Sequence, residues 1–481
     1  MALAFYGIFL FLTNSKVAVF EDEASIIAAA HRNPGELVSP FLSGTAAFHH
    51  PPLSEILLHF WLKWTGDSFA ALRIPSIFFY CLSLCIVAET AHLLWGKRWT
   101  AVTLGVAWPV GYFLGRPAGW YSLTMLGVAG LGWFYFRWRA SGRLIHLAGV
   151  SGCAILLVYT NHFGWAFLAV LTMDLWWTGA DRRRMRHFLA AVGLVALASL
   201  PLVQELFGKL QMEMSPPGRP LPAIARASYM AHSLLASEMA APWTWPGVVA
   251  AACGLGLLWL GVKQQEPRRA LLWLAVPLAI GLGTGIVSGV RLILFGPWLL
   301  LFLTSTVGFT SGRFATALAA LAFAMGWLGT ATGYYQGTHR YSEPWPQVTR
   351  QVVKLSGPGD VIVCDHSSFY LYVSHLLPFD AVHRVPAVPV IVGGRTLAGL
   401  AAWRAAAGRG GQLIYLRTTL MPWALSDEKE FLEYASRSFH LVEDLRFDRD
   451  RSAALKNYWF PELSQPEWRM QIQVWTPLRK P

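Results

Sequence analysis

The chain has 481 residues, of which 54% are hydrophobic and only 14% are charged. A soluble globular protein carries about 25% charged residues, so this composition indicates a chain solvated mainly by lipid. The formal net charge of +12 could indicate a nucleic-acid partner, but Arg and Lys concentrate in short loops between apolar runs, which is a topology pattern. The five Cys are scattered and lack zinc-ligand spacing, which argues against a disulfide scaffold and against a zinc site.

Apolar runs long enough to cross a bilayer, which takes about 20 residues, recur along the first two thirds of the chain. The pattern predicts about eleven membrane-spanning helices. Their expected ranges are 2–19, 73–95, 100–114, 118–136, 144–160, 162–178, 188–206, 243–262, 270–288, 292–309 and 314–333. The first run has no basic n-region and no Ala-x-Ala cleavage site, so we expect a retained span and not a removed signal peptide.

Basic residues mark one side of this predicted bundle. The loops on that side contain Lys97, Arg98, Arg137, Arg139, Arg143, Arg182, Arg183, Arg184, Arg186, Lys263, Arg268, Arg269 and Arg313. The positive-inside rule makes this side cytoplasmic, with the N-terminus inside and the C-terminus outside. The outer side then collects most of the unusual polar residues.

The loop after the first span, residues 20–72, carries the most distinctive of these. Glu21, Asp22 and Glu23 follow the span directly, and an ionised carboxylate at a low-dielectric boundary is penalised by several kcal/mol unless it faces water or a polar ligand. They form either a site or a helix cap that ends the span. Helices are expected over 23–32 and 53–64. In the second helix, Glu55, His59 and Lys63 fit a helix at the membrane interface.

From residue 344 onward the composition is that of a soluble domain. Expected helices cover 348–355, 367–376, 396–407 and 427–438, and expected strands cover 360–364, 381–385, 412–417, 440–447 and 470–475. This alternation predicts a small α/β layer fold with mostly parallel strands. We therefore expect a transmembrane domain over 1–333 and an extracytoplasmic α/β domain over 334–481.

Five motifs on the expected outer side are similar to those of a known family. They are Glu21-Asp22-Glu23-Ala24, His49-His50-Pro51-Pro52-Leu53, Leu72-Arg73-Ile74-Pro75-Ser76, Tyr159-Thr160-Asn161-His162-Phe163-Gly164, and Arg291 followed by Pro297. In this order they resemble the membrane glycosyltransferases of the GT-C superfamily, in the branch of the protein O-mannosyltransferases and the lipid A aminoarabinose transferase. The resemblance implies a mainly α polytopic bundle in the inner (plasma) membrane.

The resemblance also implies an activity. Such enzymes move a sugar, with inversion, from a polyprenyl-monophosphate donor to a hydroxyl acceptor at the outer membrane face. The acceptor could be a glycolipid, a polysaccharide or a protein, and nucleic acid is not a partner. The family's base maps onto Asp22, with Glu23 as its neighbour. Relatives usually carry Lys or Arg before the Pro-Pro pair, whereas this chain has His49, which is a cation only part of the time.

Cationic residues on the outer side are candidate ligands of the donor phosphate. Arg291 is favoured because a guanidinium in an apolar surround is costly unless it pairs with an anion. The further candidates are Arg116, Arg73, His49 and His50, while His162 and Tyr121 are other residues at this lip. Arg73 could equally snorkel or cap its span, and His162 fits a packing role better than a catalytic one.

Several alternatives stay open on the sequence. No cofactor is required by the family branch, although Asp22 and Glu23 could hold a divalent cation. A secondary transporter or a lipid-linked sugar flippase is the main competing function, yet the in-span acids Glu89, Asp174 and Glu205 lie near span ends and not at the bilayer midplane. In a third reading the C-terminal domain binds a glycan and the spans are an anchor.

Overall fold

The structure is a computed structural model, and the part of the chain that it describes falls into two compact units. The first unit comprises Met1–Lys16, Ala29–Trp64 and Ala70–Tyr335, and the second comprises Val17–Ala28, Thr65–Phe69 and Gln336–Pro481. The described residues are 1–14, 21–42, 51–66, 68–203, 223–237, 240, 244–283, 293–309, 312–331, 345–356, 360–364, 390–392, 411–418, 432–433, 435–437, 439–448 and 469–478.

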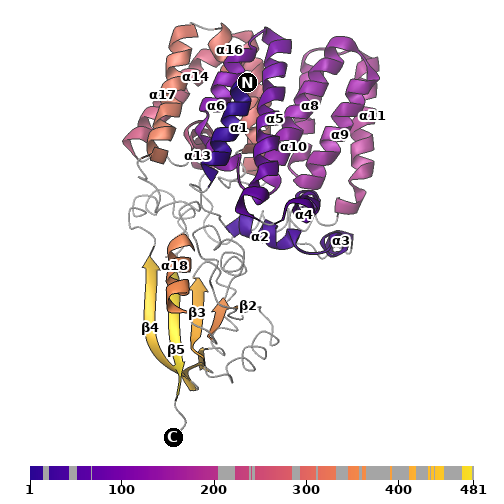
Figure 1. Cartoon of the computed structure of the whole chain (residues 1–481). Helices are drawn as coiled ribbons and strands as arrows, with labels where there is room; N and C mark the ends of the chain where they lie inside the picture. Colours follow the sequence, from indigo (N-terminus) through magenta and orange to yellow (C-terminus); the bar gives the residue numbers. More distant parts are fainter. Residues whose placement is uncertain are drawn as a thin grey trace. The chain divides into compact units, whose positions relative to one another are not determined.

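The first unit is a helix bundle in which consecutive long helices run side by side (Figure 1). Its long helices and their connectors are α1 (Ala2–Leu12), α5 (Phe69–Trp95), α6 (Arg98–Ala107), α7 (Pro109–Leu114), α8 (Trp120–Ser141), α9 (Leu144–Thr160), α10 (Gly164–Trp177), α11 (Arg182–Ala198), η2 (Leu200–Leu202), α13 (Ala223–Ala236), α14 (Trp245–Val262), α15 (Gln265–Gly283), α16 (Gly296–Phe309) and α17 (Gly312–Ala331). Every predicted span overlaps an observed helix, so the predicted polytopic bundle is confirmed.

Three helices among the described residues are long and apolar enough to cross a membrane by length and composition. These stretches are Ala70–Trp95, Trp245–Val262 and Gly312–Gly329, and shorter apolar helices cover Ala2–Leu12, Leu144–Thr160 and Ile293–Phe309. Close packing depends on small residues, as membrane helices require. A Cβ on Gly127 would lie 2.7 Å from Leu157, and one on Gly149 would lie 2.4 Å from Phe134, so α8 and α9 approach closely.

Two parts of the bundle differ from the prediction. The expected single span over 100–114 breaks at Trp108, whose backbone is extended (φ −66°, ψ 115°), because the residue before a proline avoids the helical region and Pro109 offers no N–H. Between the expected spans 188–206 and 243–262 lies α13, which was not predicted as a helix. Its residues Tyr229, Met230 and Leu234 are buried in the bundle.

Short helices follow α1 in the chain. The predicted helix over 23–32 is observed as α2 (Glu21–Ala30), and the one over 53–64 as α4 (Leu53–Thr65). A further helix, α3 (Pro34–Leu42), was not predicted because Gly35 and Pro40 interrupt its pattern. Within the first unit, α3 and α4 lie at one end of the bundle (Figure 1).

The described strands of the second unit form one five-stranded sheet in the order β2-β1-β3-β5-β4. The strands are β1 (Val361–Cys364), β2 (Val390–Val392), β3 (Leu413–Thr418), β4 (Phe439–Asp448) and β5 (Arg469–Pro477). The amphipathic helix α18 (Trp345–Leu355) buries Val348 and Val352.

The sheet is mixed, so the expectation of mostly parallel strands is wrong. β1 pairs in parallel with β2 and β3, whereas β5 is antiparallel to both β3 and β4. Helix–strand alternation in the earlier part of this domain favours parallel pairing, but the last two strands, β4 and β5, pair with each other, and β5 also lies antiparallel to β3. The short strand β2 was not predicted, and the expected strand at 381–385 and helices at 367–376 and 396–407 lie outside the described residues.

Candidate functional site

Two of the predicted phosphate ligands meet at the C-terminal end of α1. Arg73 on α5 donates from Nη1 to the main-chain oxygen of Asn14 at 3.0 Å and to its Oδ1 at 3.2 Å. Arg116 donates from Nη1 to the main-chain oxygen of Thr13 at 2.7 Å and to its Oγ1 at 3.1 Å. Both arginine side chains are fully buried. Because the last carbonyls of a helix lack intrahelical partners and carry partial negative charge, these guanidinium groups hold the end of α1.

Arg116 stands in the turn between α7 and α8. Although it is buried, its guanidinium has a donor atom that a further anion could use. Its Nε donates to the main-chain oxygen of Tyr112 at 2.7 Å, and its guanidinium carbon lies 3.8 Å from the centroid of the Tyr112 ring. Its Nη2 is buried and has no hydrogen-bond partner among the described residues. Burial lowers the pKa of Arg116, and the charge of Arg73 lowers it further. An added anion would relieve both effects.

The predicted acids open helix α2. Asp22 and Glu23 occupy its first turn, where the positive end of the helix dipole favours carboxylates. The Glu23 side chain is fully buried. The structure places Asp22 on this helix, and its side chain lies outside the described part.

The other predicted site residues have different outcomes. His49, His50 and Arg291 lie outside the described residues. His162, in the turn between α9 and α10, and Tyr121, in the first turn of α8, are buried. Within the described ranges, no group of three or more His, Cys, Asp or Glu side chains could hold a metal ion.

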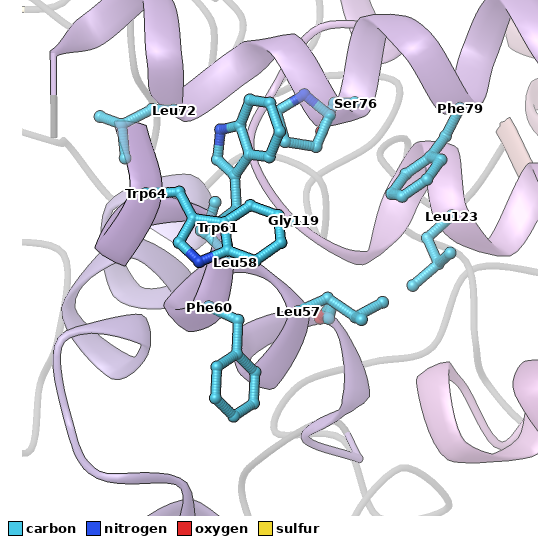
Figure 2. Close-up of a pocket in the computed structure, with 12 residues that line it drawn as sticks. Leu57, Leu58, Phe60, Trp61, Trp64, Leu72, Ser76, Phe79, Gly119 and Leu123 are labelled. Atoms are coloured by element: carbon cyan, nitrogen blue, oxygen red, sulfur yellow. The ribbon is translucent and has the colours of Figure 1, made fainter. Parts of the chain in front are cut away.

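An apolar pocket of about 250 Å³ between α4, α5 and the start of α8 was not predicted (Figure 2). Among its lining residues only Ser54 and Ser76 carry side-chain hydroxyls, so it suits an apolar guest. The α4 residues Trp64 and Phe60 also expose large parts of their rings. The pocket is lined by Ser54, Leu57, Leu58, Phe60, Trp61, Trp64, Leu72, Pro75, Ser76, Phe79, Gly119 and Leu123.

The opposite face of α4 is polar but buried, which differs from the expected interfacial polar face. Glu55 is 8% exposed and His59 is 6% exposed, whereas Lys63 is exposed as predicted. The Ser54 hydroxyl donates to Glu55 Oε2 at 2.6 Å, and His59 Nδ1 donates to the main-chain oxygen of Ala30 at 2.8 Å. The four-residue spacing of Glu55 and His59 puts them on one helix face, which is the sequence signal that could have indicated a joint role.

At the basic ends of α8, α10 and α15, Asp174 forms a closed network. Its carboxylate accepts from Tyr135 at 2.7 Å, from Arg139 at 2.9 Å, from Arg269 at 2.8 and 2.9 Å, and from Trp273 at 2.9 Å. Every lone-pair direction of this buried carboxylate is therefore used. The network links α8, α10 and α15. Because both Asp174 oxygens already accept hydrogen bonds, we assign this carboxylate a structural role.

The helix bundle and the small α/β unit match the fold of a solved structure. The chain matches the crystal structure of ArnT from Cupriavidus metallidurans in the apo state with a TM-score of 0.55. The match covers 97% of this chain and 97% of that chain at 10% sequence identity. At this identity the likeness establishes the fold, as the sequence resemblance implied. No protein-family model and no curated protein sequence matches the chain.

Proposed function

We propose that this chain is a membrane glycosyltransferase that moves a sugar from a polyprenyl-monophosphate carrier to a hydroxyl acceptor. The observation that carries the proposal is the end-to-end correspondence with the fold of ArnT, because it extends over 97% of both chains. The acceptor is a glycolipid, a polysaccharide or a protein at the outer membrane face. The N-terminus is cytoplasmic, and the C-terminal domain is extracytoplasmic.

Asp22 is the proposed general base, with Glu23 as its acidic neighbour. In the reaction the acceptor hydroxyl gives its proton to the Asp22 carboxylate while its oxygen bonds to the anomeric carbon. The bond from that carbon to the phosphate oxygen breaks, and the carrier phosphate leaves as an anion. A positioned carboxylate base supplies about 10²- to 10⁴-fold of rate in such steps.

The leaving phosphate needs positive or donor groups. Arg116 is the described candidate, since its buried Nη2 has no hydrogen-bond partner among the described residues and its pKa is lowered by burial and by Arg73. Arg291, His49 and His50 complete the proposed set, which leaves Arg73 mainly as the residue that holds Asn14.

The apolar pocket fits the start of the carrier chain. Its 250 Å³ volume is lined almost entirely by aliphatic and aromatic carbon, which favours a branched hydrocarbon over a sugar. Arg73 lies beside two pocket residues in the sequence of α5, Leu72 and Pro75.

The test is a transfer assay with the purified full chain in proteoliposomes. Polyprenyl-phosphate sugars labelled in the sugar are the donors, and total envelope lipids and proteins are the acceptors. We expect Asp22→Asn to lower the transfer rate by at least about 10²-fold, because an amide cannot take the acceptor proton. Asp181→Asn is the matched control, since Asp181 is exposed and caps α11.

An Asp22→Asn protein that transfers sugar at the wild-type rate would remove Asp22 as the base. Counterflow of a labelled solute without any glycosylated product would instead support transport.

A further inference from the structure

Helix α2, which opens with the acids, is held at its other end by a histidine. Ala30 closes α2, and its main-chain oxygen accepts a hydrogen bond from His59 Nδ1 at 2.8 Å. The two residues are 29 positions apart, and both are buried, with Ala30 1% and His59 6% exposed. The contact is therefore a specific tertiary link and not a local turn.

This link restrains the helix along its axis. The last carbonyls of an α-helix have no partner within the helix, so a donor from another element both satisfies one and fixes the position of the helix end. Asp22 lies eight residues before Ala30 on the same helix, about 12 Å along the axis at 1.5 Å per residue. Because an α-helix is stiff over two turns, a shift of Ala30 would also move the first turn of α2.

The histidine itself sits on a well-fixed helix. Trp61 Nε1 donates to the Ala71 oxygen at 2.8 Å, which ties α4 to α5. The His59 ring also meets Phe60 edge-on at 5.4 Å between centroids. On α4, the pocket residues Leu57, Trp61 and Trp64 project roughly opposite to His59, as the 100° spacing per residue requires.

Histidine is an expensive choice at this position if packing were its only role. Its Nε2 is buried without a hydrogen-bond partner among the described residues, and leaving a buried polar atom unsatisfied is destabilising. A leucine or methionine would fill the same space without that penalty. What the histidine adds is the Nδ1–H donor to Ala30.

Thr13 and Asn14, which precede the acids in the chain, also have main-chain oxygens that accept hydrogen bonds from other elements. Arg73 and Arg116 hold Asn14 and Thr13, the last described residues before α2. Main-chain carbonyls before the acids, at Thr13 and Asn14, and after them, at Ala30, therefore accept hydrogen bonds from other elements. His59 supplies the second of these attachments.

We propose that His59 is a positioning residue for Asp22 and Glu23, acting through the Ala30 carbonyl and helix α2. The proposal rests on the proposed glycosyltransferase function. The histidine sets the place of the base without touching the substrate, so its loss lowers kcat and leaves the affinity for the donor unchanged.

The experiment measures kcat and donor KM for the purified full chain with a polyprenyl-phosphate sugar. His59→Leu removes the donor to Ala30, and we expect kcat to fall by up to about 10²-fold, the effect of roughly 1 Å of misplacement, with KM within about twofold. His59→Asn keeps an N–H near the position of Nδ1 and should recover most of the rate. His92→Leu, at an exposed position on α5, is the control and should change neither constant.

A second readout needs no turnover. In a background without the native cysteines, the rate at which an impermeant maleimide labels Asp22→Cys should change severalfold on adding His59→Leu and return on adding His59→Asn. If His59→Leu does not fold, His59→Met against His59→Asn carries both measurements.

The outcomes separate the two proposals. Wild-type kcat in His59→Leu, equal losses in the Leu and Asn variants, or unchanged labelling would overturn the role of His59. A wild-type chain that transfers no sugar overturns the proposed function, and labelling then decides whether His59 positions α2. A raised KM with unchanged kcat in His59→Leu would assign His59 to donor binding and overturn the positioning role.

Discussion

A buried charged side chain is tolerated in this bundle where hydrogen bonds satisfy it. Asp174 accepts from two arginines, a tyrosine and a tryptophan, and its side chain is only 2% exposed. Glu89 makes a shorter pair with Arg98, at 2.7 Å, but there both side chains are more than 40% exposed. The contribution of each ion pair to the stability of the protein therefore depends on its burial and not on its distance.

Replacing Asp174 should destabilise the protein strongly. Asp174→Ala leaves Arg139 and Arg269 without their shared counter-charge, and breaking such a buried pair costs about 3–5 kcal/mol of unfolding free energy. The matched change Glu89→Ala should cost less than about 1 kcal/mol, because water screens that pair. Thermal denaturation in detergent measures both, and equal shifts would contradict the assigned role of the network.

Helix α4 shows how one element serves two surroundings. Its one face carries Leu57, Trp61 and Trp64 to the pocket (Figure 2). Its other face buries Glu55 and His59. The helix was predicted from its apolar period and its Pro-Pro start, and that prediction is confirmed. The burial of its polar face was not predicted, since a helix with Glu, His and Lys on one side equally fits a water-facing surface.

Filling the pocket should weaken binding of a lipid-linked donor. Ser76 is buried at the pocket wall, and Ser76→Phe would occupy space that a carrier chain needs. Losing the burial of about two methylene groups raises the donor KM by about tenfold. A short-chain, water-soluble donor should be unaffected.

The control for this change is Leu82→Phe, on the same helix but outside the pocket and partly exposed. An unchanged KM for the long-chain donor in a stably folded Ser76→Phe protein would show that the pocket does not hold the carrier.

For the whole molecule, the asymmetry of charge is the main topological signal. The last turns of α8 carry Arg137 and Arg139, and the first turns of α11 carry Arg182, Arg183, Arg184 and Arg186, at the end of the bundle that contains the Asp174 network. Charge bias in short loops fixes the orientation of a polytopic chain because positive loops stay in the cytoplasm. We therefore expect Ser141 to be cytoplasmic and Lys63 to be extracytoplasmic.

Cysteine labelling in intact spheroplasts measures this orientation. In a background lacking the native cysteines, an impermeant maleimide should label Lys63→Cys and should reach Ser141→Cys only after the membrane is permeabilised. Both positions are exposed in the structure, so a difference reports the side of the membrane and not burial. The reverse pattern would invert the orientation and place the proposed chemistry on the wrong face.

The sequence by itself determined most of the bundle helices and their order, because a bilayer demands long apolar runs whose period and length are local properties. It also singled out Arg73 and Arg116 as candidate ligands of the donor phosphate, because both are cations on the expected outer side. Only the tertiary structure decided that their partners include the carbonyls of Thr13 and Asn14, and that His59 reaches Ala30. These contacts join residues dozens of positions apart, and main-chain acceptors carry no side-chain signature that a sequence pattern could reveal.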